Sequence, residues 1–226
     1  LLLMMKIYRL LILLLLALTV SAQVGTWTNL PTLTELRSIF PLQNKVLLAS
    51  DGGVVSFDKA TQTFLPDING KQTDNLDVNA VYVDSDSLLW IGSRSPGPTV
   101  EVYDLVLESK RQIELVEVDE VSSFVQVGDS VYATYQEDLL GGLLLFRKGN
   151  SKIEYLDQFS NFPNQGNLDL SDVLDVIYHD SRLIFRTHED ILWVELDGTN
   201  LKDPANWHIS TIPAVGHTTV STSAAS

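Results

Sequence analysis

Residues 78–104, which hold the clearest pattern of the chain, are VNAVYVDSDSLLWIGSRSPGPTVEVYD. β-Branched and aromatic residues over 78–83, 88–93 and 100–104 predict three strands. The Asp84-to-Ser87 run predicts a tight turn, because Asp and Ser side chains hydrogen-bond their own backbone. Two prolines at 96 and 98 lack N–H donors and end the second strand's ladder. Gly92 predicts a close approach by a neighbouring backbone.

The same unit recurs four times along the chain. Its second strands centre on Leu48, Ile91, Ala133 and Phe185, at steps of 43, 42 and 52 residues. A period in the low forties with four strands per unit is typical of a propeller blade. We therefore expect an all-β protein, a β-propeller with four four-stranded blades that forms part of a larger, incomplete ring.

The expected strands can be given blade by blade. They are 36–40, 45–50, 53–58 and 62–65 in the first blade; 78–83, 88–93, 100–105 and 111–116 in the second; 122–127, 131–135, 143–146 and 152–156 in the third; and 174–178, 182–187, 191–196 and 207–211 in the fourth. A further outer strand around Trp27 is expected to complete the last blade of the ring and so remove a sheet edge. No long amphipathic pattern is present, so we expect almost no helix.

Two stretches resemble a known repeat. Residues 84–104, with D-x-x-x-x-x-W-I-G-S and a closing V-Y-D, resemble the two-component-regulator propeller repeat, and residues 50–58 match its Gly-Gly-apolar-x-x-aromatic-Asp half. Blades of this kind that follow Trp27 and a signal peptide are similar to the PorZ-like propellers of bacterial type IX secretion. The resemblance covers roughly residues 24–212. It implies a cell-envelope setting, either as a type IX secretion-linked surface protein or as the sensor part of a membrane regulator.

The beginning of the chain has the pattern of a secretory signal peptide. A basic segment at 5–9 precedes an apolar run at 10–20 and the small residues Val20-Ser21-Ala22. The apolar run is short for a membrane span of about 20 residues. We expect a signal peptide at 1–22, propeller blades at 23–216, and at 217–226 either the start of a further blade or a frayed tail.

Composition limits the partners. The formal net charge of −14 should repel nucleic acid and anionic lipid surfaces. We therefore expect no nucleic-acid partner and no stable membrane insertion after signal cleavage. The chain has no cysteine, so disulfides and thiol chemistry are excluded.

No motif for a cofactor, a metal or catalysis stands out. Asp84-x-Asp86 could begin a calcium loop, but calcium takes six to eight oxygen ligands and no such series follows, so a hairpin turn is favoured. The four histidines lack paired ligand spacing. Trp90 could stack on a sugar, but we favour packing between sheets because of its large apolar area. We expect no metal, no cofactor and a non-catalytic protein.

Function is expected on one face of the propeller, where the loops between second and third strands emerge together. These loops carry the candidate ligand-binding residues Asp51, Arg94, Gln136, Glu137, Asp138, His188 and Glu189. They could form a solvated acidic rim, since loops are polar by default. They could also form a mouth that binds an envelope glycan or a protein segment. A propeller-fold lyase or glycosidase is the alternative, and paired carboxylates in the channel would favour it.

Overall fold

The structure is a computed structural model that describes residues 34–65, 73–113, 116–138, 140–149, 152–163, 173–188 and 190–211. All of these residues belong to one compact unit. The predicted signal peptide, the strand around Trp27 and the segment 217–226 lie outside the described residues.

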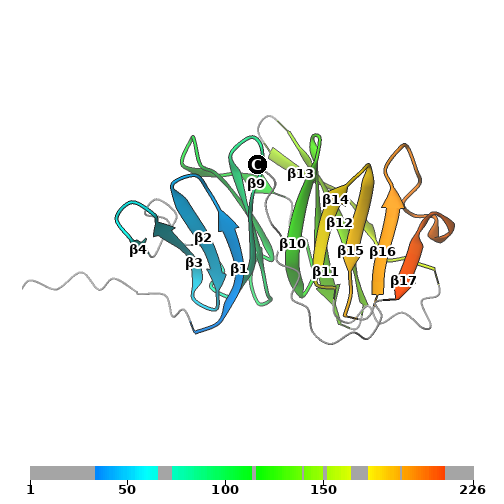
Figure 1. The fold of residues 1–226 in the computed structure, drawn as a ribbon, viewed down its shortest axis with the longest axis horizontal. Coiled ribbons are helices and arrows are strands. Elements are labelled where there is room, and N and C mark those ends of the chain that lie inside the picture. Colours follow the sequence, from blue (N-terminus) through cyan, green and yellow to red (C-terminus); the bar gives the residue numbers. More distant parts are fainter. Residues whose placement is uncertain are drawn as a thin grey trace, which may run out of the picture. The chain divides into compact units, whose positions relative to one another are not determined.

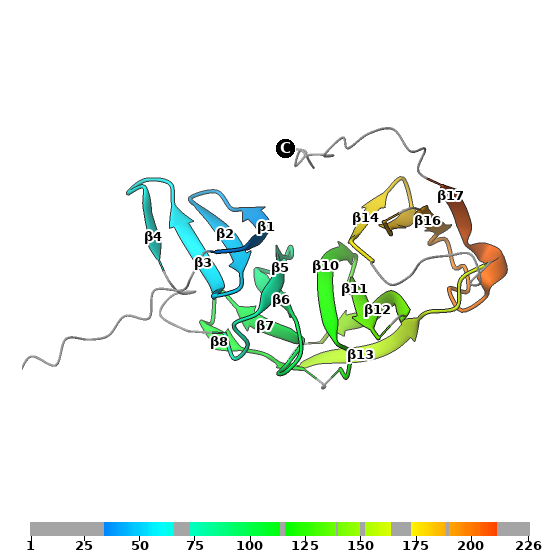
Figure 2. The ribbon, with the colours of Figure 1, turned by 90° about the horizontal axis from the view of Figure 1, so that it is seen from below.

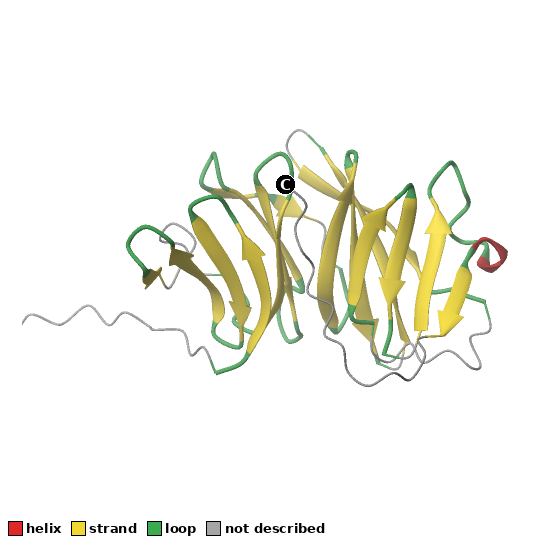
Figure 3. Cartoon of the chain, viewed as in Figure 1, coloured by secondary structure: helices red, strands yellow, loops and turns green. Residues whose placement is uncertain are grey.

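Four sheets follow one another along the chain (Figures 1 and 3). Sheet one contains β1 (Leu36–Pro41), β2 (Lys45–Ser50), β3 (Gly53–Asp58) and β4 (Thr63–Leu65); sheet two contains β5 (Val78–Val83), β6 (Leu88–Ser93), β7 (Val100–Asp104) and β8 (Ser109–Lys110). Sheet three contains β10 (Glu120–Val127), β11 (Ser130–Glu137), β12 (Leu140–Lys148) and β13 (Lys152–Phe159), with β9 (Gln112–Ile113) at its edge. Sheet four contains β14 (Asp175–His179), β15 (Arg182–Arg186), β16 (Asp190–Glu195) and β17 (His208–Thr211).

Each sheet is an antiparallel meander, as expected for a propeller blade. The only helix in the described part is the 3₁₀ turn η1 (Pro204–Asn206). The all-β, four-bladed prediction is confirmed. Strand positions agree closely with expectation for sheets one and four, whereas the strands of sheet three are longer than expected.

Figure 2 shows the four sheets in succession, and apolar side chains pack between neighbouring sheets. Leu47 and Ala49 of sheet one pack with Leu89 and Ile91 of sheet two. Equivalent clusters lie between sheets two and three and between sheets three and four. Burial of these faces is the main stabilising term, because each sheet alone would leave its apolar residues in water.

The predicted outer strand of blade two, at 111–116, is wrong. The fourth strand of sheet two is the short β8, and β9 instead pairs in parallel with β13 of sheet three, at Lys152↔Gln112 and Ile153↔Ile113. Arg111 still belongs to sheet two, because its N–H donates to the Val102 carbonyl (2.8 Å) and its side chain pairs with Asp104 (2.6 Å). Immediately after it, Ile113 packs against the core between sheets two and three.

Trp90 has the packing role expected for it. Its side chain is fully buried, and its ring lies 5.9 Å from Phe124 and 5.7 Å from Phe146 of sheet three, measured between centroids. Its indole N–H donates to Asp84 (3.0 Å). Asp84 also accepts from the N–H groups of Asp86 and Leu88, so this carboxylate holds the hairpin turn.

Three of the four first strands contain a bulge at the same place. The register shifts between Leu36 and Ser38 in β1, between Val78 and Ala80 in β5, and between Val121 and Ser123 in β10. The extra residues are Arg37, Asn79 and Ser122, which are all polar. Bulges redirect side chains and often occur near functional sites.

Candidate functional site

Most of the predicted loop residues follow the second strands, whereas Gln136 and Glu137 are the last residues of a strand that is longer than expected. Asp51 lies in the β2–β3 turn, Arg94 directly follows β6, Gln136 and Glu137 end β11, and His188 follows β15. Asp138 lies in the β11–β12 turn in a left-handed conformation (φ 51°). Glu189 lies outside the described residues.

Asp51 is engaged by the chain that leads into β1. Its carboxylate accepts a hydrogen bond from the Thr34 hydroxyl and another from the Glu35 N–H (3.2 Å). The Thr34 bond holds the pKa of Asp51 below its ordinary value. Asp51 therefore fixes a turn and is a charged acceptor at neutral pH.

Arg94 ties sheet two to sheet three, whereas Asp138 makes its contact within sheet three. Arg94 pairs with Glu120 at the start of β10 (2.8 Å), and the two residues also form an isolated β-bridge. The Asp138 N–H donates to the Asp119 side chain (2.8 Å). The Arg94 side chain is 48% exposed, so this ion pair adds little stability and serves mainly to align the loops.

The remaining candidates do not converge with these on one described cavity. Gln136 donates from its side chain to the Asp138 carbonyl (3.1 Å). Glu137 contributes to a small acidic hollow of about 340 Å³ between sheets two and three, together with Glu117 and Asp119. His188 is exposed at the end of sheet four. Their role in binding stays a prediction.

A larger cavity lies where the first strands of all four sheets come together, and Figure 2 shows β1, β5, β10 and β14 on that side of their sheets. Its volume is about 850 Å³. Its lining residues come from these strands and from the end of β15, and include Arg37, Ser38, Phe40, Tyr82, Ser122, Ser123, Asp175, Tyr178 and Arg186. This cavity, which we call the channel, is the candidate functional site.

The polar side chains of the channel lie at the beginning of the first strands, close to the predicted loop face. Arg37, Ser38, Ser122, Ser123 and Asp175 all precede the middle of their strands. The aromatic residues Phe40, Tyr82 and Tyr178 lie further along, and Phe40 meets Tyr82 edge-on at 5.5 Å between centroids. The channel thus has a polar end and an aromatic end, a combination suited to an amphipathic ligand.

Arg37 is neutralised within the protein. It donates to Asp77, to Asn79 Oδ1 (2.7 Å) and to Glu35 Oε2 (2.9 Å). Burial opposes its charge, but the hydrogen bonds to Glu35 and Asp77 hold the pKa of Arg37 above its ordinary value. Two of the bulged residues, Arg37 and Asn79, therefore join sheets one and two.

Asp175 joins sheets three and four in a similar way. The Ser123 hydroxyl donates to Asp175 Oδ1 at 2.6 Å. Arg186 faces Asp175 across the β14–β15 ladder, yet no carboxylate of the described residues lies within ion-pair distance of its guanidinium. Arg186 is exposed, and it is the cation of the channel lining that the surrounding described residues leave unpaired.

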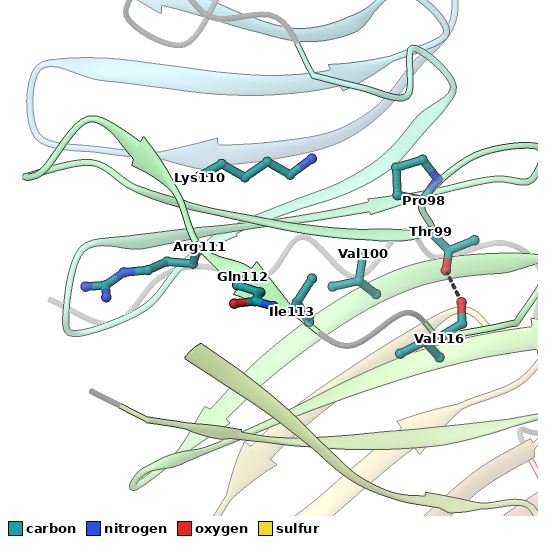
Figure 4. Close-up of a pocket in the computed structure, with 8 residues that line it drawn as sticks. All are labelled: Pro98, Thr99, Val100, Lys110, Arg111, Gln112, Ile113 and Val116. Carbon is teal, nitrogen blue, oxygen red and sulfur yellow. Dashed lines mark hydrogen bonds between the residues drawn. The ribbon is translucent and has the colours of Figure 1, made fainter. Parts of the chain in front are cut away.

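A second cavity, of about 420 Å³, lies beside the start of β7 (Figure 4). Its cations are already paired: Lys110 with Asp74 and Glu101, and Arg111 with Asp104. The Thr99 hydroxyl donates across it to the Val116 carbonyl (3.2 Å). This cavity therefore lies where sheets two and three pack against each other.

Among the described residues, no group of three or more His, Cys, Asp or Glu side chains is placed to hold a metal ion. Within the same part of the chain, no helix is long and apolar enough to cross a membrane.

Comparison with known proteins supports the fold. No family model matches the sequence, and a search of curated proteins gives no significant match. Among solved structures, the chain is similar to the extracellular domain of BT4673 from B. thetaiotaomicron, described as that of a one-component system, with 14% identity, a TM-score of 0.54, and coverage of 85% of this chain and 24% of that one. A second structure of that extracellular domain, described as that of a hybrid two-component system, gives 15% identity, a TM-score of 0.51, and coverage of 82% and 22%. The computationally designed Ika8 protein gives 14% identity, a TM-score of 0.50, and coverage of 74% and 48%.

These likenesses show the fold alone, because the identities are low. The chain spans about a quarter of the matched BT4673 chain and about half of Ika8. The propeller expected from the two-component-regulator repeat is thus confirmed as a fold, and a specific tie to PorZ-like proteins stays a proposal.

The loop-based prediction missed the polar residues of the inner strands. Arg186 lies two positions before His188, and Ser122, Ser123 and Asp175 belong to predicted first strands. A usable signal was present, because polar residues on a first strand face the channel when they interrupt its apolar pattern.

Proposed function

We propose that this protein is an exported, non-catalytic binding module of the bacterial cell envelope, and that the channel and its loop face hold the ligand. The observation that carries the proposal is a single cavity of about 850 Å³ lined by strands of all four sheets, polar at one end and aromatic at the other. Its size matches cavities that bind small organic ligands.

The setting rests on two further supports. The repeat resemblance implies the cell envelope, and two of the similar solved structures are extracellular domains. We favour a sensor ectodomain over a type IX secretion component, because the structural likeness is to the extracellular part of a signalling protein. The ligand is an envelope glycan or a protein segment.

The enzyme alternative has less support. Glycoside hydrolysis ordinarily uses two carboxylates that flank the scissile bond. Among the described residues that line the channel, Asp175 is the single carboxylate, and it is held by Ser123.

A blocking variant tests the proposal. Ser38 lines the channel and is half-buried, so Ser38→Trp should fill the space and reduce binding of an envelope glycan or peptide by at least about tenfold, the effect of roughly 1.4 kcal/mol. Thr63→Trp, on the exposed outer strand β4, is the matched control and should leave binding unchanged. Full binding by folded Ser38→Trp protein would contradict the channel as the site.

A further inference from the structure

The polar end of the channel contains a cationic side chain that the carboxylates of the described residues leave without an ion pair. Arg186 carries a guanidinium with no ion pair among the described residues. An arginine without an ion pair at the edge of a cavity favours a ligand that carries negative charge and accepts hydrogen bonds.

The carboxylates around this end are largely occupied. Asp77 forms an ion pair with Arg37, and Glu120 forms one with Arg94. Glu120 also accepts a hydrogen bond from the Ser122 hydroxyl (3.2 Å), and Asp175 accepts one from the Ser123 hydroxyl. Arg37 therefore has two carboxylate partners, whereas Arg186 has no carboxylate of the described residues within ion-pair distance. The contrast is notable in a chain with net charge −14, in which acids outnumber bases 29 to 15.

From this balance we infer that the channel binds an organic anion, a carboxylate or phosphate ester, with its charged group on Arg186 and its apolar part toward Phe40, Tyr82 and Tyr178. This inference rests on the proposed function and adds the chemical class of the ligand. A guanidinium is well suited to the task, because its planar set of donors matches a carboxylate or phosphate in a bidentate arrangement.

Asp175 sets the strength of this interaction. It lies opposite Arg186 in the β14–β15 register and repels an incoming anion. Asp175→Asn keeps an acceptor for the Ser123 hydroxyl and removes the negative charge. Anion binding should therefore rise in this variant, a response that a purely structural Asp175 would not give.

The test uses three probes with the same phenyl group: 3-phenylpropionate, 2-phenylethyl phosphate and the neutral 3-phenylpropionamide. Binding is followed at low salt by NMR shifts of channel residues, with millimolar probe and the full chain. Wild-type protein should bind at least one anion about tenfold more tightly than the amide, as expected for a charge-assisted hydrogen bond. The two anions distinguish carboxylate from phosphate recognition.

Variants then assign the preference. Arg186→Gln should lower the affinity for the anions to that for the amide, and Asp175→Asn should raise the affinity for the anions a few-fold. Arg147→Gln is the matched control, because Arg147 is an exposed arginine on β12 outside the channel lining, and it should behave as wild type. Equal binding of anion and amide at the channel would overturn the anion inference while leaving the proposed function intact. Absence of any channel shift with all three probes would overturn both.

Discussion

Trp90 joins the hairpin turn of its own sheet to the core between sheets two and three. Its ring contacts aromatic side chains of sheet three, and its N–H satisfies the buried carboxylate of Asp84. Trp90→Ala should lower the free energy of unfolding by about 3–5 kcal/mol, measured by urea denaturation followed by circular dichroism. Val106→Ala, at a side chain that is 73% exposed, is the control and should change it by less than about 0.5 kcal/mol. A small loss for Trp90→Ala would contradict the packing role.

Gly92 shows at the same scale why the Trp-Ile-Gly-Ser segment needs its glycine. A β-carbon at this position would lie 2.6 Å from the Val121 carbonyl oxygen of sheet three. Backbone cannot yield as a flexible side chain does, so Gly92→Ala should destabilise by roughly 1–3 kcal/mol, the usual cost of overpacking. Gly198→Ala has open space around it but a left-handed backbone, and it should cost about 1 kcal/mol or less. A neutral Gly92→Ala would show that the sheets can move apart freely.

Asp104 links stability to pH. Hydrogen bonds from the Leu107 N–H, the Arg111 side chain and the Val106 N–H hold the pKa of Asp104 below its ordinary value. A lowered folded-state pKa means that the contribution is present above the unfolded value of about 3.9 and is lost as pH falls through the folded value. Asp104→Asn should therefore be less stable than wild type at pH 7, and the two unfolding curves should converge in strong acid. A difference that stays constant from pH 7 to pH 2 would contradict this assignment.

At the scale of elements, turns repeat with their chemistry. Asp58 and Asp104 end the third strands of sheets one and two, and each accepts from the two N–H groups that lie two and three residues later. Asp180 and Ser181 form the β14–β15 hairpin with both residues at positive φ, 47° and 63°. Glycine at this position removes the penalty that a left-handed backbone imposes on serine, although glycine loses more entropy on folding. Because the first effect outweighs the second, Ser181→Gly should raise the free energy of unfolding by about 0.5–1 kcal/mol, measured by thermal unfolding. The reverse change in the equivalent turn, Gly128→Ser at φ 60°, should destabilise by a similar amount.

Local pattern was enough to place most of these elements. Strand alternation and turn residues predicted Lys45–Ser50, Gly53–Asp58, Val78–Val83 and Leu88–Ser93 with the bounds observed. The outer strand of blade two could not be placed in this way, because the transfer of β9 to sheet three depends on its pairing with β13, far along the chain. The bulges and the side chains that line the channel escaped prediction for the same reason, since they depend on which residues face each other across sheets. Loop polarity therefore identified the face of the site but not the side chains that line its cavity.

At the scale of the molecule, contacts between sheets run from one to two, two to three and three to four. The faces of sheets one and four that turn away from these contacts carry exposed apolar residues, among them Phe64 (57%) and Ile177 (43%), which also borders the channel. Propeller sheets ordinarily pack on both faces, and exposed apolar faces promote association. We therefore expect a chain of residues 23–226 to bind a hydrophobic dye and to associate with rising concentration.

Substitution on those two faces tests the expectation. Phe64→Glu combined with Ile177→Glu should give a monomer in sedimentation and should reduce dye binding severalfold, because charge on an apolar face opposes its burial. Leu107→Glu is the control, since Leu107 is equally exposed (65%) but lies in the β7–β8 turn, away from both faces. It should associate as wild type does. The exposed faces of sheets one and four are different surfaces, so we expect sheet one of one chain to contact sheet four of the next, in a head-to-tail arrangement. Either single substitution should therefore weaken association, as expected for a heterologous contact. A wild-type chain that stays monomeric, silent toward the dye and sharply two-state in unfolding would instead mean that the four sheets satisfy one another as a closed propeller.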